Sequence, residues 1–234
     1  MEFLAGFRGG FMIEGILVLN KPKGITSHDV VSFVRRKFKM RRVGHAGTLD
    51  PIATGVLVVL LGKATKLFDR FVAFDKAYQA TLTLGMTTTT ADIQGEVIER
   101  LPYAQVSKEQ IEEAFQRFVG PIQQIPPMVS AVKQNGQRLY KLARRGLFVE
   151  RTPRSIRIDL LQLIDFLKPD VKFYVECSKG TYVRQLAQDI GDILGCGACI
   201  SQIERTKVGP FVLPEAIPLE ALNESHIRRW PGKI

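Results

Sequence analysis

Residues 56–61 (VLVVLL) form an unbroken aliphatic segment with a glycine at each end, Gly55 and Gly62. A short apolar segment bounded by glycines is typical of a fully buried strand. The glycine-rich loop that precedes it, residues 44–55 (GHAGTLDPIATG), contains one acidic residue, Asp50. Loops held by buried strands are common positions for fixed catalytic groups. This pattern makes Asp50 a candidate catalytic residue.

Positive charge is concentrated in two segments of the chain. Six of the eight residues from 35 to 42 are basic, and residues 133–157 carry a net charge of +7. The whole chain has a net charge of +10, so subtracting these thirteen charges leaves −3 for the remaining residues. Two solvated helix faces are one explanation. A phosphate-contacting face explains the segregation better, because the rest of the chain is slightly acidic. A lone carboxylate beside such a surface indicates an enzyme that acts on a polyanion.

The hydrophobic pattern predicts a mixture of strands and helices without a regular βαβ rhythm, which favours the α+β class. We expect strands at residues 13–19, 56–61, 76–84, 155–166 and 171–177. We expect helices at residues 27–39 (capped by Ser27), 63–74, 108 to about 119 (behind a capping box at Ser107), 182–194 and 219–227. Residues 85–95 are predicted as a polar loop, and residues 124–152 as a basic excursion with a short helix over 139–145.

Several classes of protein are disfavoured by the sequence. Neither a complete phosphate-binding loop nor a dinucleotide fingerprint is present, and the acidic residues are scattered, so we expect no nucleotide cofactor and no metal. No segment has the length of a membrane span, and residues 1–11 do not resemble a signal peptide. Three cysteines without a secretory signal predict buried, reduced thiols and a cytoplasmic protein. We expect one domain over residues 12–234, preceded by a disordered extension at 1–11.

Several candidate site residues also have an ordinary structural explanation, which residue type alone does not exclude. Asp50 can serve its own turn, Tyr78 can be a core aromatic on a strand, and His45 can satisfy a loop hydrogen bond. Arg184 is harder to explain in this way. It falls in the first turn of the 182–194 helix, where the helix dipole disfavours positive charge. A fixed carboxylate beside Arg184 accounts for its position, and Asp50 is the natural partner.

At these residues the chain resembles the bacterial tRNA pseudouridine synthases of the TruB family. Ordered matching blocks run from about residue 16 to residue 206. The blocks are residues 20–24 (NKPKG), 44–55, 75–78 (DKAY), 92–95 (DIQG), 127–133 (PMVSAVK), 177–184 (CSKGTYVR) and 195–198 (GCGA).

The resemblance implies a pseudouridine-synthase-like α+β fold, in which helices flank a mixed, largely antiparallel sheet and RNA binds in a cleft across it. It implies an enzyme that isomerises uridine 55 in the T-loop of tRNA without a cofactor. Asp50 would be the catalytic aspartate, Tyr78 would stack on the flipped uracil, and Arg184 would pair with Asp50. Residues 124–152 would be the thumb-like insertion that clasps the T-loop. The further residues assigned to RNA binding are His45, Tyr182, Ile203, Lys21, Lys133, Arg144 and Arg145, with Ile203 standing where a leucine is expected.

Some alternatives stay open at this point. Asp50 can act as a nucleophile or as the base that forms a glycal intermediate. A non-catalytic RNA-binding or chaperone protein would also explain the charge, and a synthase of the same fold can act on another RNA. Relatives often carry a further RNA-binding domain of the PUA type, for which residues up to Ile234 leave no room, so we expect weaker tRNA binding than in longer relatives. We expect the protein to be a monomer.

Overall fold

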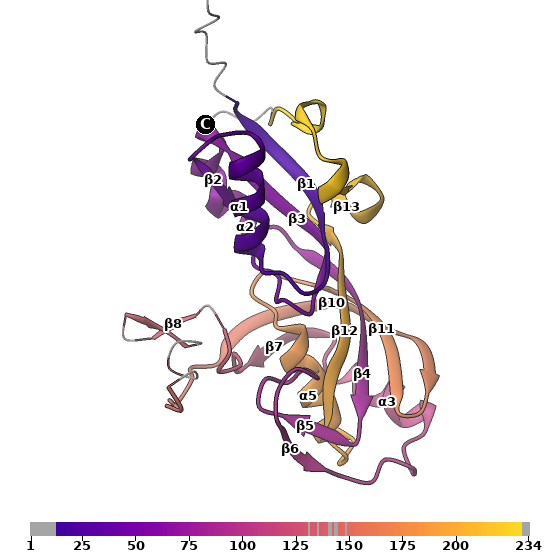
Figure 1. Ribbon diagram of the computed structural model, residues 1–234. Helices are drawn as coiled ribbons and strands as arrows, with labels where there is room; N and C mark the ends of the chain where they lie inside the picture. The colour runs from indigo at the N-terminus through magenta and orange to yellow at the C-terminus, as the bar shows by residue number, and fades with distance from the viewer. Residues whose placement is uncertain are drawn as a thin grey trace, which may run out of the picture.

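The computed structural model describes residues 13–130, 132–134, 136–139, 142, 145–147 and 149–230 (Figure 1). Strand β3 (Thr54–Leu61) is buried along its length, as the aliphatic segment predicted. Its side chains alternate between two hydrophobic cores, one on each face of the sheet. Leu57, Val59 and Leu61 pack into the larger core, and Val56, Val58 and Leu60 pack into the smaller one.

One mixed sheet of ten strands organises the molecule. Its main order is β14-β1-β3-β12-β4-β11-β10-β7, with β2 paired to β3 and β13 paired to β12. The pairs β1–β14 and β3–β12 are parallel, and the other pairs are antiparallel. The predicted α+β class, with a mixed and largely antiparallel sheet flanked by helices, is confirmed.

The strands of this sheet are β1 (Gly15–Lys21), β2 (Val43–His45), β3, β4 (Lys76–Leu84), β7 (Gly120–Gln124), β10 (Arg154–Leu167), β11 (Asp170–Cys177), β12 (Ala198–Val208), β13 (Phe211–Val212) and β14 (Ile217–Pro218). Two small hairpins pair β5 (Met86–Thr88) with β6 (Val97–Arg100) and β8 (Lys133–Gln134) with β9 (Gln137–Arg138). The helices within the described residues are α1 (Ser27–Lys37), α2 (Phe68–Val72), α3 (Lys108–Gln116) and α5 (Val183–Ile193). Short 3-10 turns lie at Gly62–Leu67, Leu213–Glu215, Leu219–Ala221 and Glu224–His226.

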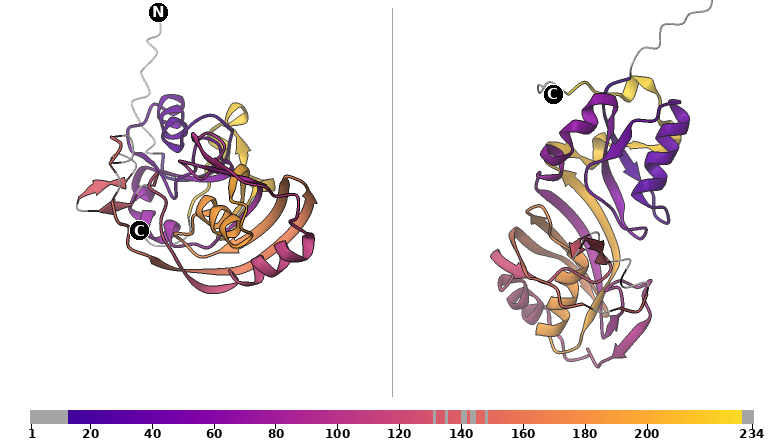
Figure 2. Two further views of the ribbon diagram at one scale, coloured as in Figure 1. Left: turned by 90° about the horizontal axis from the view of Figure 1, so that it is seen from below. Right: turned by 90° about the vertical axis from the view of Figure 1, so that its left-hand side faces the viewer.

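The sheet joins two lobes, which the right-hand view of Figure 2 shows one above the other. In the upper lobe, β1 and β3 lie between α1 on one face and α2 on the other. In the lower lobe, α3 and α5 cover the apolar face of β4, β11 and β10. Strands β4 and β12 pair along most of their length, and β12 also pairs with β3, so these strands connect the lobes. The junction between the lobes therefore lies where the end of β12 meets β3.

Several predicted elements are confirmed and others are corrected. Strand β4 and helix α3, with its capping box at Ser107, match the prediction. Thr26, not Ser27, caps α1, because the Thr26 hydroxyl and the Asp29 carboxylate form a capping box. Residues 85–95 are not wholly a loop, since β5 begins at Met86 and pairs with β6. The predicted helix at 63–74 is a 3-10 turn followed by α2, and 219–227 contains only 3-10 turns.

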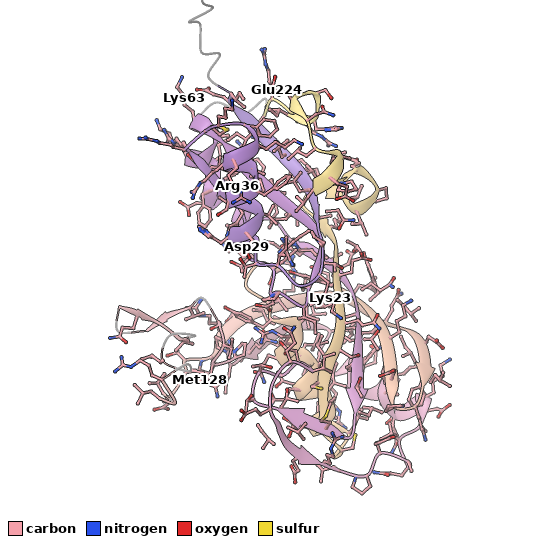
Figure 3. The ribbon with its side chains drawn as sticks, viewed as in Figure 1. Lys23, Asp29, Arg36, Lys63, Met128 and Glu224 are labelled. Atoms are coloured by element: carbon pink, nitrogen blue, oxygen red, sulfur yellow. The ribbon has the colours of Figure 1, made fainter. Side chains whose placement is uncertain are left out.

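The described residues between 124 and 152 leave the body of the protein on one side, where the β8–β9 hairpin projects in Figure 1 and Met128 is labelled in Figure 3. The predicted short helix over 139–145 and the extension at residues 1–11 lie wholly or partly outside the described residues. None of the helices in the described part of the chain is long and apolar enough to cross a membrane.

An aromatic cluster packs into the smaller core of the upper lobe. The ring of Trp230 lies 4.8 Å from that of Phe71, centre to centre, and Phe74 and Phe211 complete the cluster. The guanidinium of Arg70 lies over the Trp230 ring at 5.6 Å. This cluster holds the last described residues against α2.

Candidate active site

The loop that carries Asp50 is fixed from two sides. The buried hydroxyl of Ser27, at the start of α1, accepts a hydrogen bond from the Leu49 amide and donates one to the Leu49 carbonyl. On the other side, the Pro51 carbonyl accepts a hydrogen bond from Gly24 in the turn after β1. These contacts hold the backbone on both sides of Asp50, whose carboxylate remains partly exposed to solvent. A carboxylate so held is suited to act on a bound molecule with little rearrangement.

Arg184 forms the ion pair with Asp50 that the sequence predicted. Its Nε lies 2.9 Å from Oδ2 of Asp50, and its side chain is only 4% exposed. The rest of the guanidinium is fixed by other segments. Nη1 donates to the Thr90 carbonyl at 2.6 Å and lies 3.5 Å from Oδ2 of Asp92, and Nη2 donates to the Val129 carbonyl at 2.9 Å. Arg184 therefore joins the Asp50 loop, the loop after β5 and the base of the insertion.

A cleft opens beside this ion pair, and we call it the Asp50 cleft. Six of the residues predicted from sequence line it together: His45, Asp50, Tyr78, Tyr182, Arg184 and Ile203. Other residues in its lining are Phe68, Val72, Lys76, Val129, Ser130 and Arg205. They come from β2, β4, β12, α2, α5 and the base of the insertion, so the fold brings distant parts of the chain to one site.

The chemistry of the cleft is set by burial. Burial raises the pKa of the Tyr78 phenol, and the neighbouring Arg205 guanidinium opposes that shift. Burial also raises the pKa of Tyr182. Burial lowers the pKa of His45. At pH 7 both phenols and the His45 imidazole are therefore uncharged, which suits contact with an uncharged, aromatic ligand.

The amide of Gln124 positions the start of α5. Gln124 Oε1 accepts a hydrogen bond from the Tyr182 amide at 2.9 Å, and Nε2 donates to the Tyr182 carbonyl at 3.1 Å. The Gln124 side chain is buried at the end of β7, where the insertion begins. Tyr182 is the N-cap residue of α5, and its own side chain does not cap the helix. Gln124 thus fixes the turn that carries both Tyr182 and Arg184.

Arg205 was missed by the sequence interpretation, which did not predict β12. Its side chain is 1% exposed. Its Nε donates to the Val56 carbonyl at 2.8 Å, and Nη1 and Nη2 donate to the Thr48 and Gly47 carbonyls, each at 3.3 Å. Gly55 passes so close that a Cβ there would lie 2.3 Å from the Arg205 carbonyl oxygen. The loop rich in glycine is therefore wrapped around the buried Arg205. The sequence gives no local signal for this role, because residues 198–208 were not predicted as a strand.

Lys21 differs from its prediction as an RNA-contacting residue. Its side chain is fully buried, and Nζ donates to the Pro22 and Ile25 carbonyls. We therefore replace the expected RNA contact with a structural role in the turn after β1. Lys76, at the start of β4, is buried in the same way and donates to the Val72 and Phe74 carbonyls. Burial lowers the pKa of each lysine from 10.5 to about 8.

The basic residues predicted in the insertion are only partly described. Arg145 is exposed, and its amide donates to the Leu142 carbonyl. The side chain of Lys133 and all of Arg144 lie outside the described residues. Their assignment to RNA binding stays a prediction.

The cysteines and acidic residues suggest no further chemistry at the site. All three cysteines are free and buried, and burial raises the pKa of Cys177 to about 12, which makes its thiol unreactive. Within the described residues, no three His, Cys, Asp or Glu side chains are grouped so that they could hold a metal ion.

Two family descriptions match the chain in succession. Residues 35–183 match "TruB family pseudouridylate synthase (N terminal domain)", and residues 184–229 match "tRNA pseudouridylate synthase B C-terminal domain". The chain is 49% identical over 222 residues to tRNA pseudouridine synthase B of Symbiobacterium thermophilum, an alignment that covers 94% of this chain and 74% of the relative. It is 48% identical over 214 residues to the enzyme of that name from Stutzerimonas stutzeri, covering 92% and 70%.

Solved structures with a similar fold come from larger proteins. A chain of a Cbf5-Nop10-Gar1 complex superposes with a TM-score of 0.71 and 31% identity, over 89% of this chain and 53% of that chain. A chain of an H/ACA RNP bound to a substrate RNA containing 2′-deoxyuridine gives a TM-score of 0.66 and 28% identity, over 89% and 52%. This chain thus spans about half the length of each of these two chains.

Proposed function

The chain belongs to the TruB family of pseudouridylate synthases, and on this basis we propose that it isomerises uridine 55 in the T-loop of tRNA, with Asp50 as the reacting residue. The observation that carries the proposal is the Asp50 carboxylate, held by Arg184 at the edge of a cleft that also contains Tyr78. The names of the relatives support tRNA as the substrate, and the two basic segments support a polyanionic partner.

A base inside a folded loop must leave its stack before a side chain can reach its sugar. The Asp50 cleft offers the target uracil an aromatic surface at Tyr78, and its other walls come from Tyr182 and Ile203. The uncharged Tyr78, Tyr182 and His45 suit a neutral pyrimidine. The target nucleotide would then lie with C1′ of its sugar beside the Asp50 carboxylate, which Arg184 keeps oriented.

In the reaction the bond between C1′ and N1 breaks, the uracil turns, and a bond forms between C1′ and C5. The C5 hydrogen is lost as a proton and N1 gains one, so the product is an isomer and no external reductant or energy source is consumed. Asp50 assists the first step as a nucleophile at C1′ or as the base that forms a glycal. Tyr78 lies next to the base in either route, and it can accept the C5 proton only as a phenolate, a form that burial disfavours and the neighbouring Arg205 guanidinium favours.

We predict that Asp50→Asn lowers tritium release from tRNA containing 5-tritiated uridine by about three orders of magnitude or more, because no other described carboxylate lines the cleft. Binding of tRNA, measured by filter retention, should change little, since the change removes no contact with phosphate. Asp165→Asn, at an exposed position of β10, is the matched control and should behave like the wild type. Tritium release by Asp50→Asn at the wild-type rate would exclude Asp50 from the reaction.

The substrate assignment needs a separate measurement. After incubation of bulk tRNA with the protein, sequencing should show that uridine 55 is converted to pseudouridine. A tRNA transcript without its T-loop should not react. Conversion of a different uridine would favour a synthase of the same fold with another target. Binding without any conversion by the wild-type protein would favour an RNA chaperone. We also propose that the enzyme acts as a monomer in the cytoplasm, which agrees with its free, buried cysteines.

A further inference from the structure

Three buried cations surround the Asp50 cleft without a carboxylate partner. Lys21, Lys76 and Arg205 are 0%, 8% and 1% exposed, and the hydrogen bonds of their charged groups go to backbone carbonyls. Among the described residues, no aspartate or glutamate forms an ion pair with any of them. Arg184, in contrast, pairs with both Asp50 and Asp92. The cleft therefore carries an excess of buried positive charge.

Burying a charge without an opposite charge is energetically unfavourable, and carbonyl dipoles offset only part of the lost hydration. The lowered pKa values of Lys21 and Lys76 reflect that cost. A hydrophobic side chain of similar size at these positions would avoid it. The charges are explained if the site must stabilise an anion that is present only during turnover.

Arg205 lies beside the position proposed for the target base. It is the direct cross-strand partner of Tyr78 in the β12–β4 pairing, so both side chains lie on the same face of the sheet. Arg205 and Lys76 both line the cleft, whereas Lys21 is not among its lining residues. Arg205 also influences the pKa values of Lys21, His45, Lys76 and Tyr78, which places its charge at the centre of these groups.

The proposed reaction creates an anion at this place. When the bond between C1′ and N1 breaks, its electron pair leaves with the base, so the uracil carries one negative charge over N1, O2 and O4. The charge disappears when C5 bonds to C1′ and the C5 proton is transferred. This holds whether Asp50 acts as a nucleophile or as a base. A fixed positive charge beside the uracil stabilises this state more than the neutral substrate, which is how electrostatic catalysis lowers a barrier.

We propose that Arg205, assisted by Lys76, is the fixed positive charge that stabilises the uracil anion while it is detached from the sugar. This inference rests on the proposed function. A backbone phosphate is the other anion in the substrate, but a phosphate ester remains hydrated at the rim of a cleft, and Arg205 lies at its floor with almost no exposed surface. In the proposed arrangement the base, and not a phosphate, is the part of the nucleotide that reaches Arg205.

The test compares Arg205→Lys with Arg205→Met in single-turnover tritium release at saturating enzyme. Lysine keeps the charge but cannot hold the Gly47 and Thr48 carbonyls together, whereas methionine loses both properties. We expect a loss of about tenfold for Arg205→Lys and of about 10²–10³-fold for Arg205→Met, the range for removal of an oxyanion-stabilising donor, with the Kd for tRNA unchanged. Equal losses in the two variants would show that Arg205 acts only by holding the loop and would overturn the proposal.

Lys76→Met keeps the proposal testable if the Arg205 variants do not fold, as judged by circular dichroism. It removes a charge without touching the Asp50 loop, so we expect about a tenfold lower rate, with recovery in Lys76→Arg. Lys108→Met, on the exposed face of α3, is the matched control and should be unchanged. If the Arg205 variants do not fold and Lys76→Met has a normal rate, the proposal is overturned. It is also overturned if the Arg205 or the Lys76 variants show a raised Kd for tRNA with a shallower salt dependence, because that result assigns the side chain to phosphate binding. Failure of the wild type to release tritium would instead refute the proposed function.

Discussion

At the scale of single residues, the buried lysines couple the charge of the cleft to pH. Lys76 is surrounded by Arg205 and Lys179, which lower its pKa, and by Asp75 and Cys177, which raise it, but burial dominates and brings the pKa to about 8. In the unfolded chain the ordinary pKa of 10.5 applies. Between these values the unfolded chain binds more protons than the folded protein. The free energy of unfolding therefore rises with pH in this range, and the cost of the charge is fully present below pH 8.

We predict that the stability of the wild type relative to Lys76→Met increases by about 2 kcal/mol between pH 7.5 and pH 9.5, since each pKa unit corresponds to about 1.4 kcal/mol. Urea unfolding at the two pH values measures the difference. Lys21 contributes equally to both proteins and cancels from the comparison. Lys108→Met, an exposed position, should show no such change. A constant difference between the wild type and Lys76→Met would mean that Lys76 is hydrated in the folded protein.

At the scale of secondary-structure elements, the N-terminus of α5 depends on β7. The helix has no side-chain cap of its own, and the Gln124 amide makes hydrogen bonds with both backbone groups of Tyr182. Because Tyr182 and Arg184 both line the Asp50 cleft, this one amide affects the position of two site residues. Gln124 is therefore a positioning residue.

We predict that Gln124→Met lowers the free energy of unfolding by about 1 kcal/mol, because it leaves the half-buried Tyr182 amide without its hydrogen-bond partner, whereas the Tyr182 carbonyl still accepts from the Leu186 amide. It should also lower kcat by about tenfold, because Arg184 no longer holds Asp50 in one orientation. Gln123→Met is the matched control, since Gln123 is exposed and donates to Ser155 Oγ on the neighbouring strand. Denaturant unfolding and tritium release measure the two effects. A stable Gln124→Met variant with normal turnover would contradict the role of Gln124 as a positioning residue.

The elements that the sequence predicted well are those with a clear period or cap. Strand β4 alternates apolar and polar residues, and α3 begins with a capping box. Strand β12 was not predicted, because Ser201, Gln202, Glu204 and Lys207 interrupt its apolar residues. It nevertheless lies inside the sheet, where pairing with β3 and β4 overrides the local pattern. The β5–β6 hairpin was missed because its threonine-rich connection has no short turn signature.

At the scale of the whole molecule, the two lobes present basic residues on different elements. Arg36 and Lys37 are exposed on α1 in the upper lobe, where Arg36 is labelled in Figure 3. The insertion adds charge from the side of the lower lobe. Contacts with a long, folded RNA would therefore be distributed over both lobes, with the Asp50 cleft between them.

We predict that the double variant Arg36→Gln/Lys37→Gln weakens binding of all tRNAs to a similar extent. The slope of log K against log salt should fall by up to about two, because each substitution leaves about one phosphate without its cation. Turnover at saturating tRNA should not change. Filter binding at several salt concentrations tests this, with Lys108→Gln as the exposed control. An unchanged slope would remove α1 from the RNA-binding surface.

The composition of the site was only partly accessible from sequence. Asp50 and Arg184 were predicted as partners because each is unusual in its own segment, and resemblance to a family added His45, Tyr182 and Ile203. The sequence does not show which polar side chains are buried. Lys21 was therefore assigned to RNA contact, although the structure buries it. Arg205 lies in a strand that was not predicted, and its hydrogen bonds to Gly47 and Thr48 cross more than 150 residues of chain. Such long-range contacts leave no local pattern.

Trp230 is the only tryptophan in the chain, and it rests on Phe71 of α2 with Arg70 over its ring. Phe68, at the start of the same short helix, lines the Asp50 cleft. The protein thus contains one indole fluorophore, which packs on the same short helix that contributes Phe68 to the wall of the Asp50 cleft. Its emission offers a label-free, real-time signal for the arrival of RNA, readable by stopped-flow mixing without modifying either molecule.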